Sequence, residues 1–275
     1  MNRRTPGAYL LLLILCVVAL FPIYWMVKTS LTPEGSVYRT PPSVLIQSGD
    51  LELGRYQRIW HESPVGRWLL NTMLVGIVTS LLCILVSVPA AYALSRFRFR
   101  WGIVAGYSLL VTRMMPLTLL IIPMYMIFAR VGLLNKLFSI IIADLAYILP
   151  FSVWILKGFF DGIPAAVDES AEIDGCSTLR ILHSIILPLS LPGIGAAVLY
   201  SFVRVWSEFL FVSTFMTSPE NFTVTVGAQL YAGSLRVSWG DIMAVTTLGS
   251  LPMVALFLYL EKYFVSGLAA GAVKE

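Results

Sequence analysis

The stretch ESAEIDGCSTLRILHSIILP, Glu169–Pro188, is a polar block with a helical rhythm that lies between long apolar runs. Pro164, just before it, suits the first residue of a helix, where its missing N–H costs nothing. Gly175 suits the residue just past the end of that helix. We therefore predict a helix of about eleven residues between these two positions, roughly 16 Å long.

A second helix is expected after Gly175. Ser177 can cap a helix that runs to Leu187, and Pro188 then ends this helix or bends it into the membrane. The pattern favours a short helix–turn–helix lying across one mouth of a membrane bundle. The alternative interpretation is a solvated acidic loop without a partner.

The composition is that of an integral membrane protein. Of 275 residues, 58% are hydrophobic and only 12% are charged, whereas soluble domains carry about 25% charged residues. The net charge of +4 suits loops that meet anionic lipid head groups, and the basic residues form no patch of the kind that binds nucleic acid. The three cysteines, Cys16, Cys83 and Cys176, indicate neither a disulfide framework nor a zinc site.

Membrane spans need about 20 apolar residues each. Six segments meet this need, namely 8–28, 69–95, 102–129, 137–157, 190–217 and 241–261. No small-residue cleavage site follows the first, so we expect a retained span rather than a signal peptide. The predicted fold is all-α: an integral membrane six-helix bundle, forming a single transmembrane domain over 1–275 with a polar loop at 158–188 and a tail at 262–275.

The orientation follows from the basic residues. An even number of spans places both termini on one side of the membrane, and positive charge near span ends marks the cytoplasm. Arg96, Arg98 and Arg100 crowd one loop between spans, and Arg3 and Arg4 precede the first span. We expect both termini, and the block between spans four and five, in the cytoplasm.

Charged side chains also occur inside the expected spans, where they normally face a cavity or a partner. Arg204 and Glu208 are four residues apart and can pair along one helix, and Arg113 can pair with Asp144 between helices. Structural ion pairs are one interpretation. The other is a ligand path through the bundle, with aromatic ring faces among its walls, lined by Arg113, Asp144, Tyr200, Arg204, Trp206 and Glu208.

A family resemblance rests on the spacing within the polar block. Glu169-Ser170-Ala171, Gly175 and Ile185-x-Leu187-Pro188 resemble the E-A-A-x₃-G-x₉-I-x-L-P signature of ABC importer permeases, with Ser170 in place of alanine. The segments NTMLVG, PAAYALSRFRFR and SGLAAGAVKE, together with the six-span layout, are similar to the carbohydrate-uptake class, of the type of the six-span membrane subunit of maltose transporters.

The resemblance implies that the block is a cytoplasmic coupling helix docked on a separate ATPase subunit. The implied docking residues are Asp168, Glu169, Ser170, Ala171, Asp174, Gly175, Leu187 and Pro188. A secondary ATPase contact is implied in the tail, at Gly267, Gly271 and Lys274.

The resemblance also implies the partners and the location. The partners are a sister permease subunit in a pseudo-symmetric heterodimer, two ATP-binding subunits, an extracellular or periplasmic substrate-binding protein and membrane lipid. ATP and Mg are used by the ATPase subunit, and this chain binds no cofactor. The location is the cytoplasmic membrane of a bacterium or archaeon, crossed several times.

Catalytic and metal motifs are missing from the sequence. It contains no G-x-x-x-x-G-K-[ST] phosphate loop, no H-E-x-x-H pair and no G-x-S-x-G elbow. We therefore predict no catalytic and no metal-binding residues, and a non-catalytic subunit. Two alternatives to an importer subunit remain: a secondary transporter driven by an ion gradient, and a structural or assembly membrane protein.

Overall fold

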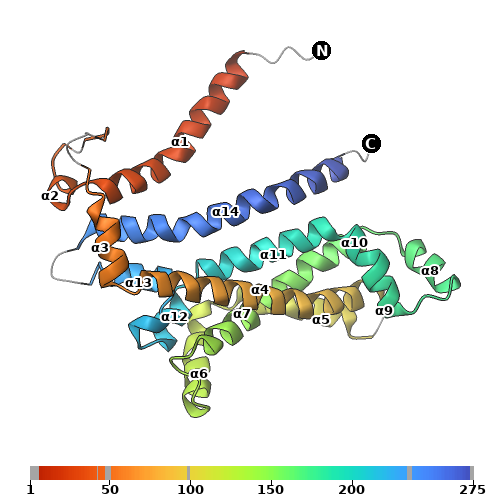
Figure 1. The fold of residues 1–275 in the computed structure, drawn as a ribbon. Helices are drawn as coiled ribbons and strands as arrows, with labels where there is room; N and C mark the ends of the chain where they lie inside the picture. Colours follow the sequence, from red (N-terminus) through yellow and green to blue (C-terminus); the bar gives the residue numbers. More distant parts are fainter. Residues whose placement is uncertain (1–5, 42, 47–50, 98–99, 234–236, 273–275) are drawn as a thin grey trace. The chain divides into compact units, whose positions relative to one another are not determined.

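The computed structural model describes residues 6–41, 43–46, 51–97, 100–233 and 237–272, and their side chains except those of 6, 103 and 260–272. Within these residues the chain is helical and has no strand (Figure 1). The helices are α1 Pro6–Leu31, α2 Glu34–Val37, α3 Gly54–Glu62, α4 Val65–Arg96, α5 Gly102–Met114, α6 Leu117–Arg130, α7 Leu137–Asp161, α8 Ala165–Ile173, α9 Thr178–Ile181, the π-helical turn Leu182–Ile186, α10 Leu187–Leu189, α11 Leu191–Trp206, α12 Leu210–Phe215, the 3₁₀ turn Pro219–Asn221, α13 Val224–Gln229 and α14 Trp239–Ala272.

The apolar helices confirm the predicted all-α membrane fold. In the described part of the chain four helices are long and apolar enough to cross a membrane, and two bent helix pairs raise the number to six if each pair is one span. The pair α5–α6 bends by 95° where Met115 and Pro116 adopt extended backbone conformations, as expected of a residue before proline. The second pair bends by 81° between α10 and α11.

The chain divides into two compact units, Met1–Leu69 with Val224–Pro252, and Leu70–Thr223 with Met253–Glu275. The single domain over 1–275 and its span limits stay a prediction. The first unit is organised around Arg55, which is 1% exposed. Its guanidinium pairs with Glu52 at 2.8 Å and Asp241 at 3.1 Å, and it donates to the carbonyl of Ser30 at 2.7 Å. These contacts join α1, α3 and the start of α14.

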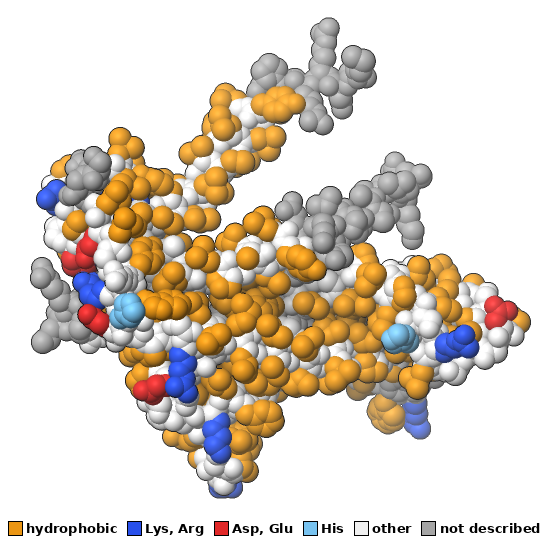
Figure 2. All heavy atoms as spheres, viewed as in Figure 1, with side chains coloured by type: hydrophobic (Ala, Val, Ile, Leu, Met, Phe, Trp, Pro, Cys, Tyr) orange, Lys and Arg blue, Asp and Glu red, His pale blue; other side chains and the backbone are white. Residues whose placement is uncertain are grey.

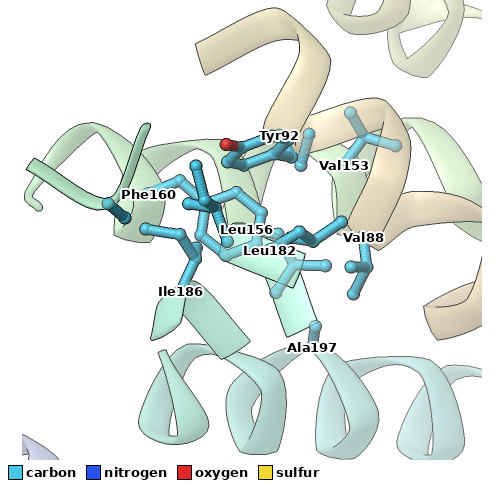
Figure 3. Packing of buried hydrophobic residues seen from close by; sticks show 11 residues of the cluster. Val88, Tyr92, Val153, Leu156, Phe160, Leu182, Ile186 and Ala197 are labelled. Carbon is cyan, nitrogen blue, oxygen red and sulfur yellow. The ribbon is translucent and has the colours of Figure 1, made fainter. Parts of the chain in front are cut away.

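The second unit has a core to which α4, α7, α8, the π-helical turn and α11 all contribute (Figure 3). Its buried members are Val88, Ala91, Tyr92, Val153, Leu156, Phe160, Ala171, Ile181, Leu182, Ile186 and Ala197. The polar block thus supplies four apolar side chains to the same core as the membrane-crossing helices α4 and α7. This shared packing fixes the α8–α10 segment, residues 165–189, to the helix bundle of its unit.

Candidate functional site

Helix α8 forms close to where the sequence predicts it. Pro164 has an extended ψ of 135° and precedes the helix as its N-cap, so the helix covers nine residues rather than about eleven. The difference lies within the usual uncertainty of helix ends. Asp168 lies in the first turn, where a carboxylate interacts favourably with the helix dipole.

Gly175 ends α8, as predicted. Its φ is +80°, a conformation that costs a residue with a Cβ roughly 1–2 kcal/mol. The N–H of Gly175 donates to the carbonyl of Glu172 at 3.0 Å, and the N–H of Cys176 donates to the carbonyl of Ala171 at 2.9 Å. These two hydrogen bonds form a Schellman motif, which turns the chain sharply toward α9.

One face of α8 is held against α4. Asp168 is only 7% exposed. The hydroxyl of Tyr92 donates to its Oδ1 at 2.8 Å, and Arg96 Nε forms an ion pair with its Oδ2 at 2.9 Å. Arg96 also donates to the carbonyl of Ile163 at 3.0 Å. Ala171, on the same face, is buried in the core. Two of the residues predicted to dock a partner, Asp168 and Ala171, therefore face their own chain.

The opposite face of the segment is exposed. Glu169, Ser170 and Glu172 lie on it, and the isoleucine and leucine at the turn, Ile173 and Leu179, are 87% and 78% exposed. We call these five residues the outer face. Charged side chains appear over α8 and α9 in Figure 2, whereas hydrophobic side chains cover α1. Ile173 and Leu179 are not among the docking residues predicted from the sequence, although two large apolar residues beside a predicted turn are a signal that points to them.

The second half of the segment is irregular. Ser177 is the N-cap of α9 as predicted, but its hydroxyl caps no amide. The π-helical turn Leu182–Ile186 follows, a rare conformation that often occurs at functional sites. Leu187 is half-buried, Pro188 is exposed, and the chain bends at Ser190. The predicted bend at Pro188 therefore occurs two residues later.

A second candidate site is a cavity of about 160 Å³ in the same unit. It is lined by Leu117, Asp144, Tyr147, Ile148, Arg204, Ser207, Glu208, Phe209 and Leu210. Asp144 is 2% exposed, and its Oδ2 has no hydrogen-bond partner in the described part of the chain. Glu208 accepts the backbone N–H groups of Phe211 at 2.7 Å and Val212 at 3.1 Å. Glu208 thereby caps α12, whereas Asp144 lines the cavity and has one carboxyl oxygen without a hydrogen-bond partner among the described residues.

The two arginines of the predicted path, Arg113 and Arg204, both lie beside aromatic rings. Arg113 donates to the hydroxyl of Tyr200, and its guanidinium lies 4.8 Å from the ring centre of Tyr147 and 5.1 Å from that of Phe151. Arg113 thus contacts aromatic rings rather than Asp144. The guanidinium of Arg204 lies 5.6 Å from the ring centre of the same residue, Tyr147. Tyr147 therefore links the two arginines, a role that the sequence analysis did not foresee.

Trp206, another predicted path residue, packs against a different aromatic ring. It is buried and stacks on Phe202 with ring centres 5.3 Å apart. In the tail, Gly267 and Gly271 fall in the last turns of α14, and Lys274 lies outside the described residues, as do Arg3, Arg4 and Arg98. Among the residues whose side chains are described, no three His, Cys, Asp or Glu groups come together as they would around a metal ion.

The fold and the site together define a class of protein. A transport permease has this architecture: apolar helices cross the membrane, and an exposed polar helix pair that joins two of them is anchored in their core. The chain belongs to the family of binding-protein-dependent transport system inner membrane components, whose model matches residues 83–269. This confirms the resemblance stated from the sequence. The chain is therefore a multi-pass permease subunit of an ABC importer, which works in a complex with an ATPase and a substrate-binding protein.

Individual relatives agree with this assignment. The chain is 32% identical over 278 residues to the inner membrane ABC transporter permease protein YcjP of Escherichia coli, covering 99% of each chain. It is 32% identical over 265 residues to the trehalose/maltose transport system permease protein of Thermococcus litoralis, covering 95% of this chain and 94% of the relative. It is 32% identical over 269 residues to the sulfoquinovosyl glycerol transport system permease protein of Agrobacterium fabrum, covering 98% and 94%.

The fold also matches a solved structure. A chain of a bacterial ABC transporter involved in the import of the acidic polysaccharide alginate superposes with a TM-score of 0.79, at 22% identity, covering 96% of this chain and 99% of that chain. The family assignment excludes the secondary transporter driven by an ion gradient and the purely structural membrane protein.

Proposed function

We propose that this chain is the non-catalytic permease through which an importer takes up a sugar, an oligosaccharide, or a related polyol or polyol phosphate. The support is that relatives sharing 32% of its residues are permeases for trehalose/maltose and for sulfoquinovosyl glycerol. ATP and Mg belong to the partner ATPase, and this chain binds no cofactor. A sister permease, two ATP-binding subunits and a substrate-binding protein complete the complex.

In this proposal the outer face of the α8–α10 segment is the docking surface for the ATPase subunit. The observation that supports it is the exposure of this face, while the opposite face of α8 packs against its own chain. Ile173 and Leu179 expose apolar side chains next to the carboxylates of Glu169 and Glu172. Exposed apolar groups rimmed by polar ones mark protein contacts. The segment then lies in the cytoplasm, with both termini.

The inner face of α8 positions that surface. Asp168, Tyr92 and Arg96 fix α8 to α4, and Ala171 packs in the core. A force applied by the ATPase at the outer face is thereby passed to a helix that crosses the membrane. Asp168 and Ala171 act in this proposal as positioning residues, and Gly175, Leu187 and Pro188 shape the turn and the bend. Asp174 adds an exposed carboxylate beside the outer face. The tail residues Gly267, Gly271 and Lys274 form a secondary contact.

The cavity at Asp144 is the part of the translocation path that this chain contributes. A carboxyl oxygen without a partner accepts hydroxyl hydrogen bonds, Arg204 donates, and Tyr147 offers a ring face. These are the groups that recognise a pyranose, which has an apolar CH face and a polar rim.

The docking proposal is tested by replacing the exposed apolar residues in the assembled complex. In Ile173→Asp/Leu179→Asp the loss of two central contacts, at about 2 kcal/mol each, should abolish co-purification of the ATPase subunit and uptake. The control is Val131→Asp, which adds one such charge at a valine that is 60% exposed and should change neither. Retention of the ATPase by the double variant would refute the docking surface.

The substrate class is tested with the complex in liposomes. Substrate-loaded binding protein should stimulate ATP hydrolysis with one member of a panel of sugars, polyols and polyol phosphates. Stimulation by amino acids alone would refute the carbohydrate assignment and leave the docking surface unaffected.

A further inference from the structure

The first unit contains a cavity of about 280 Å³ that the proposed transport function does not use. Its lining residues come from the last turns of α1 and the residue after it, from α2 and from the start of α14, elements that are labelled in Figure 1. The residues that line it are Trp25, Lys28, Thr29, Thr32, Ser36, Val37, Trp239 and Met243. All of them belong to the same compact unit.

Lys28 is the unusual member of this set. The residue as a whole is 6% exposed, and its ammonium lies 4.9 Å from the ring centre of Trp25. No acidic side chain among the described residues forms an ion pair with it. The nearby carboxylates of Glu34, Glu52 and Asp241 pair with Arg55 instead. An ammonium at the wall of a cavity without a counter-anion favours the binding of an anion there, because the cation–π contact satisfies only part of its charge.

The remaining polar groups of the cavity are hydroxyls. The Thr32 hydroxyl donates to the carbonyl of Lys28 at 2.8 Å, and Thr29 and Ser36 are two further hydroxyl residues in the lining. No carboxylate lines the cavity. A set of donors around one positive charge suits an anion with several oxygen acceptors, and suits a neutral sugar poorly.

The position of the cavity along the chain indicates which anion. Lys28 lies near the end of the apolar stretch Gly7–Leu31, and Trp239 is the first residue of the apolar stretch Trp239–Tyr259. The cavity therefore lies at the boundary between membrane and water, where tryptophans are enriched and where the phosphates of lipids are found. We propose that this cavity binds the phosphate group of an anionic phospholipid, with Lys28 as counter-ion and the two indoles against the apolar part of the lipid.

The test uses the purified complex and dioleoyl phosphatidylglycerol as probe, with retained lipids counted by native mass spectrometry. Lys28→Gln should retain one lipid fewer than the wild type and bind the lost one at least tenfold more weakly. Lys28→Arg, which keeps the charge, should retain it. The control Lys136→Gln removes an exposed lysine and should leave the count unchanged. Equal lipid counts in the wild type and Lys28→Gln would overturn the proposal.

A second arm separates the two sources of the phosphate group. Glycerol 3-phosphate at millimolar concentration should fail to displace the lipid, because it lacks the acyl chains that the indoles contact. Displacement by glycerol 3-phosphate, abolished in Lys28→Gln, would identify a free phosphate ester as the ligand and overturn the lipid assignment. Trp25→Phe should weaken binding of the lipid while leaving the charge in place, and an unchanged affinity would contradict the role of the indole.

Discussion

Two buried aspartates of the second unit differ in how their carboxyl groups are satisfied. Asp168 in the α8–α10 segment is bonded to Tyr92 and paired with Arg96. Oδ2 of each carboxyl lacks a hydrogen-bond partner among the described residues. That of Asp168 lies 2.9 Å from Arg96 Nε, whereas Asp144, which is more deeply buried, forms no ion pair with a described residue. A satisfied buried charge holds structure together, whereas an unsatisfied one costs stability. The contrast indicates that Asp168 positions a helix and that Asp144 is kept for a ligand.

The largest expected effect is that of Asp168→Asn on stability. The amide leaves Arg96 without its counter-charge, and breaking a buried ion pair costs about 3–5 kcal/mol. The midpoint of thermal unfolding of the complex should fall and ATPase co-purification should drop. The control Asp174→Asn makes the same change at an exposed position and should leave the midpoint unaltered. If both variants unfold at the wild-type midpoint, Asp168 does not hold α8.

At Asp144 the same change should affect uptake rather than stability. Asp144→Asn removes a partly unsatisfied carboxyl, so the unfolding midpoint should stay the same or rise. Uptake in liposomes should fall by about 10–100-fold, because a hydrogen bond from a substrate to a charged group contributes about 1.5–3 kcal/mol. Normal uptake together with a lowered midpoint would show that Asp144 is structural, and the two aspartates would then have the same role.

The next effect comes from the turn at Gly175. An added Cβ at Gly175 or at Gly158 meets nothing within 4 Å, and only Gly175 has a positive φ. Gly175→Ala should therefore cost roughly 1–2 kcal/mol, whereas Gly158→Ala should be neutral or stabilise by about 0.5–1 kcal/mol. Unfolding of the two complexes in parallel measures the difference. Equal midpoints would mean that the Schellman turn contributes nothing to the segment.

The smallest effect is expected for Tyr92→Phe. It removes one hydrogen bond to Asp168, at about 1 kcal/mol, and keeps the ring that contacts Phe160. Combined with Asp168→Asn it should add less than its single effect, since both remove the same contact. Strict additivity in this double-mutant cycle would show that the two side chains act independently.

The sequence predicted what depends on neighbours along the chain. Helix α8 and the turn at Gly175 follow from residues a few positions apart, and so does the bend near Pro188. It could not predict the direction of Asp168, because Tyr92 lies 76 residues away. For the same reason it could not predict that Tyr147 contacts both Arg113 and Arg204, or that Lys28 and Trp239 line one cavity. The residues of the π-helical turn, Leu182–Ile186, contain no sequence pattern from which this conformation could be predicted.

The central claim is that the outer face contacts the ATPase subunit. The most direct measurement places the photoreactive residue p-benzoylphenylalanine at Leu179 and irradiates the assembled complex in membranes. The matched control is Phe138, a 55% exposed aromatic residue of α7. A cross-linked product of the permease with the ATPase subunit is expected from position 179 and not from position 138. An assembled, active complex that gives no such product at Leu179, or the same product at both positions, would contradict the account.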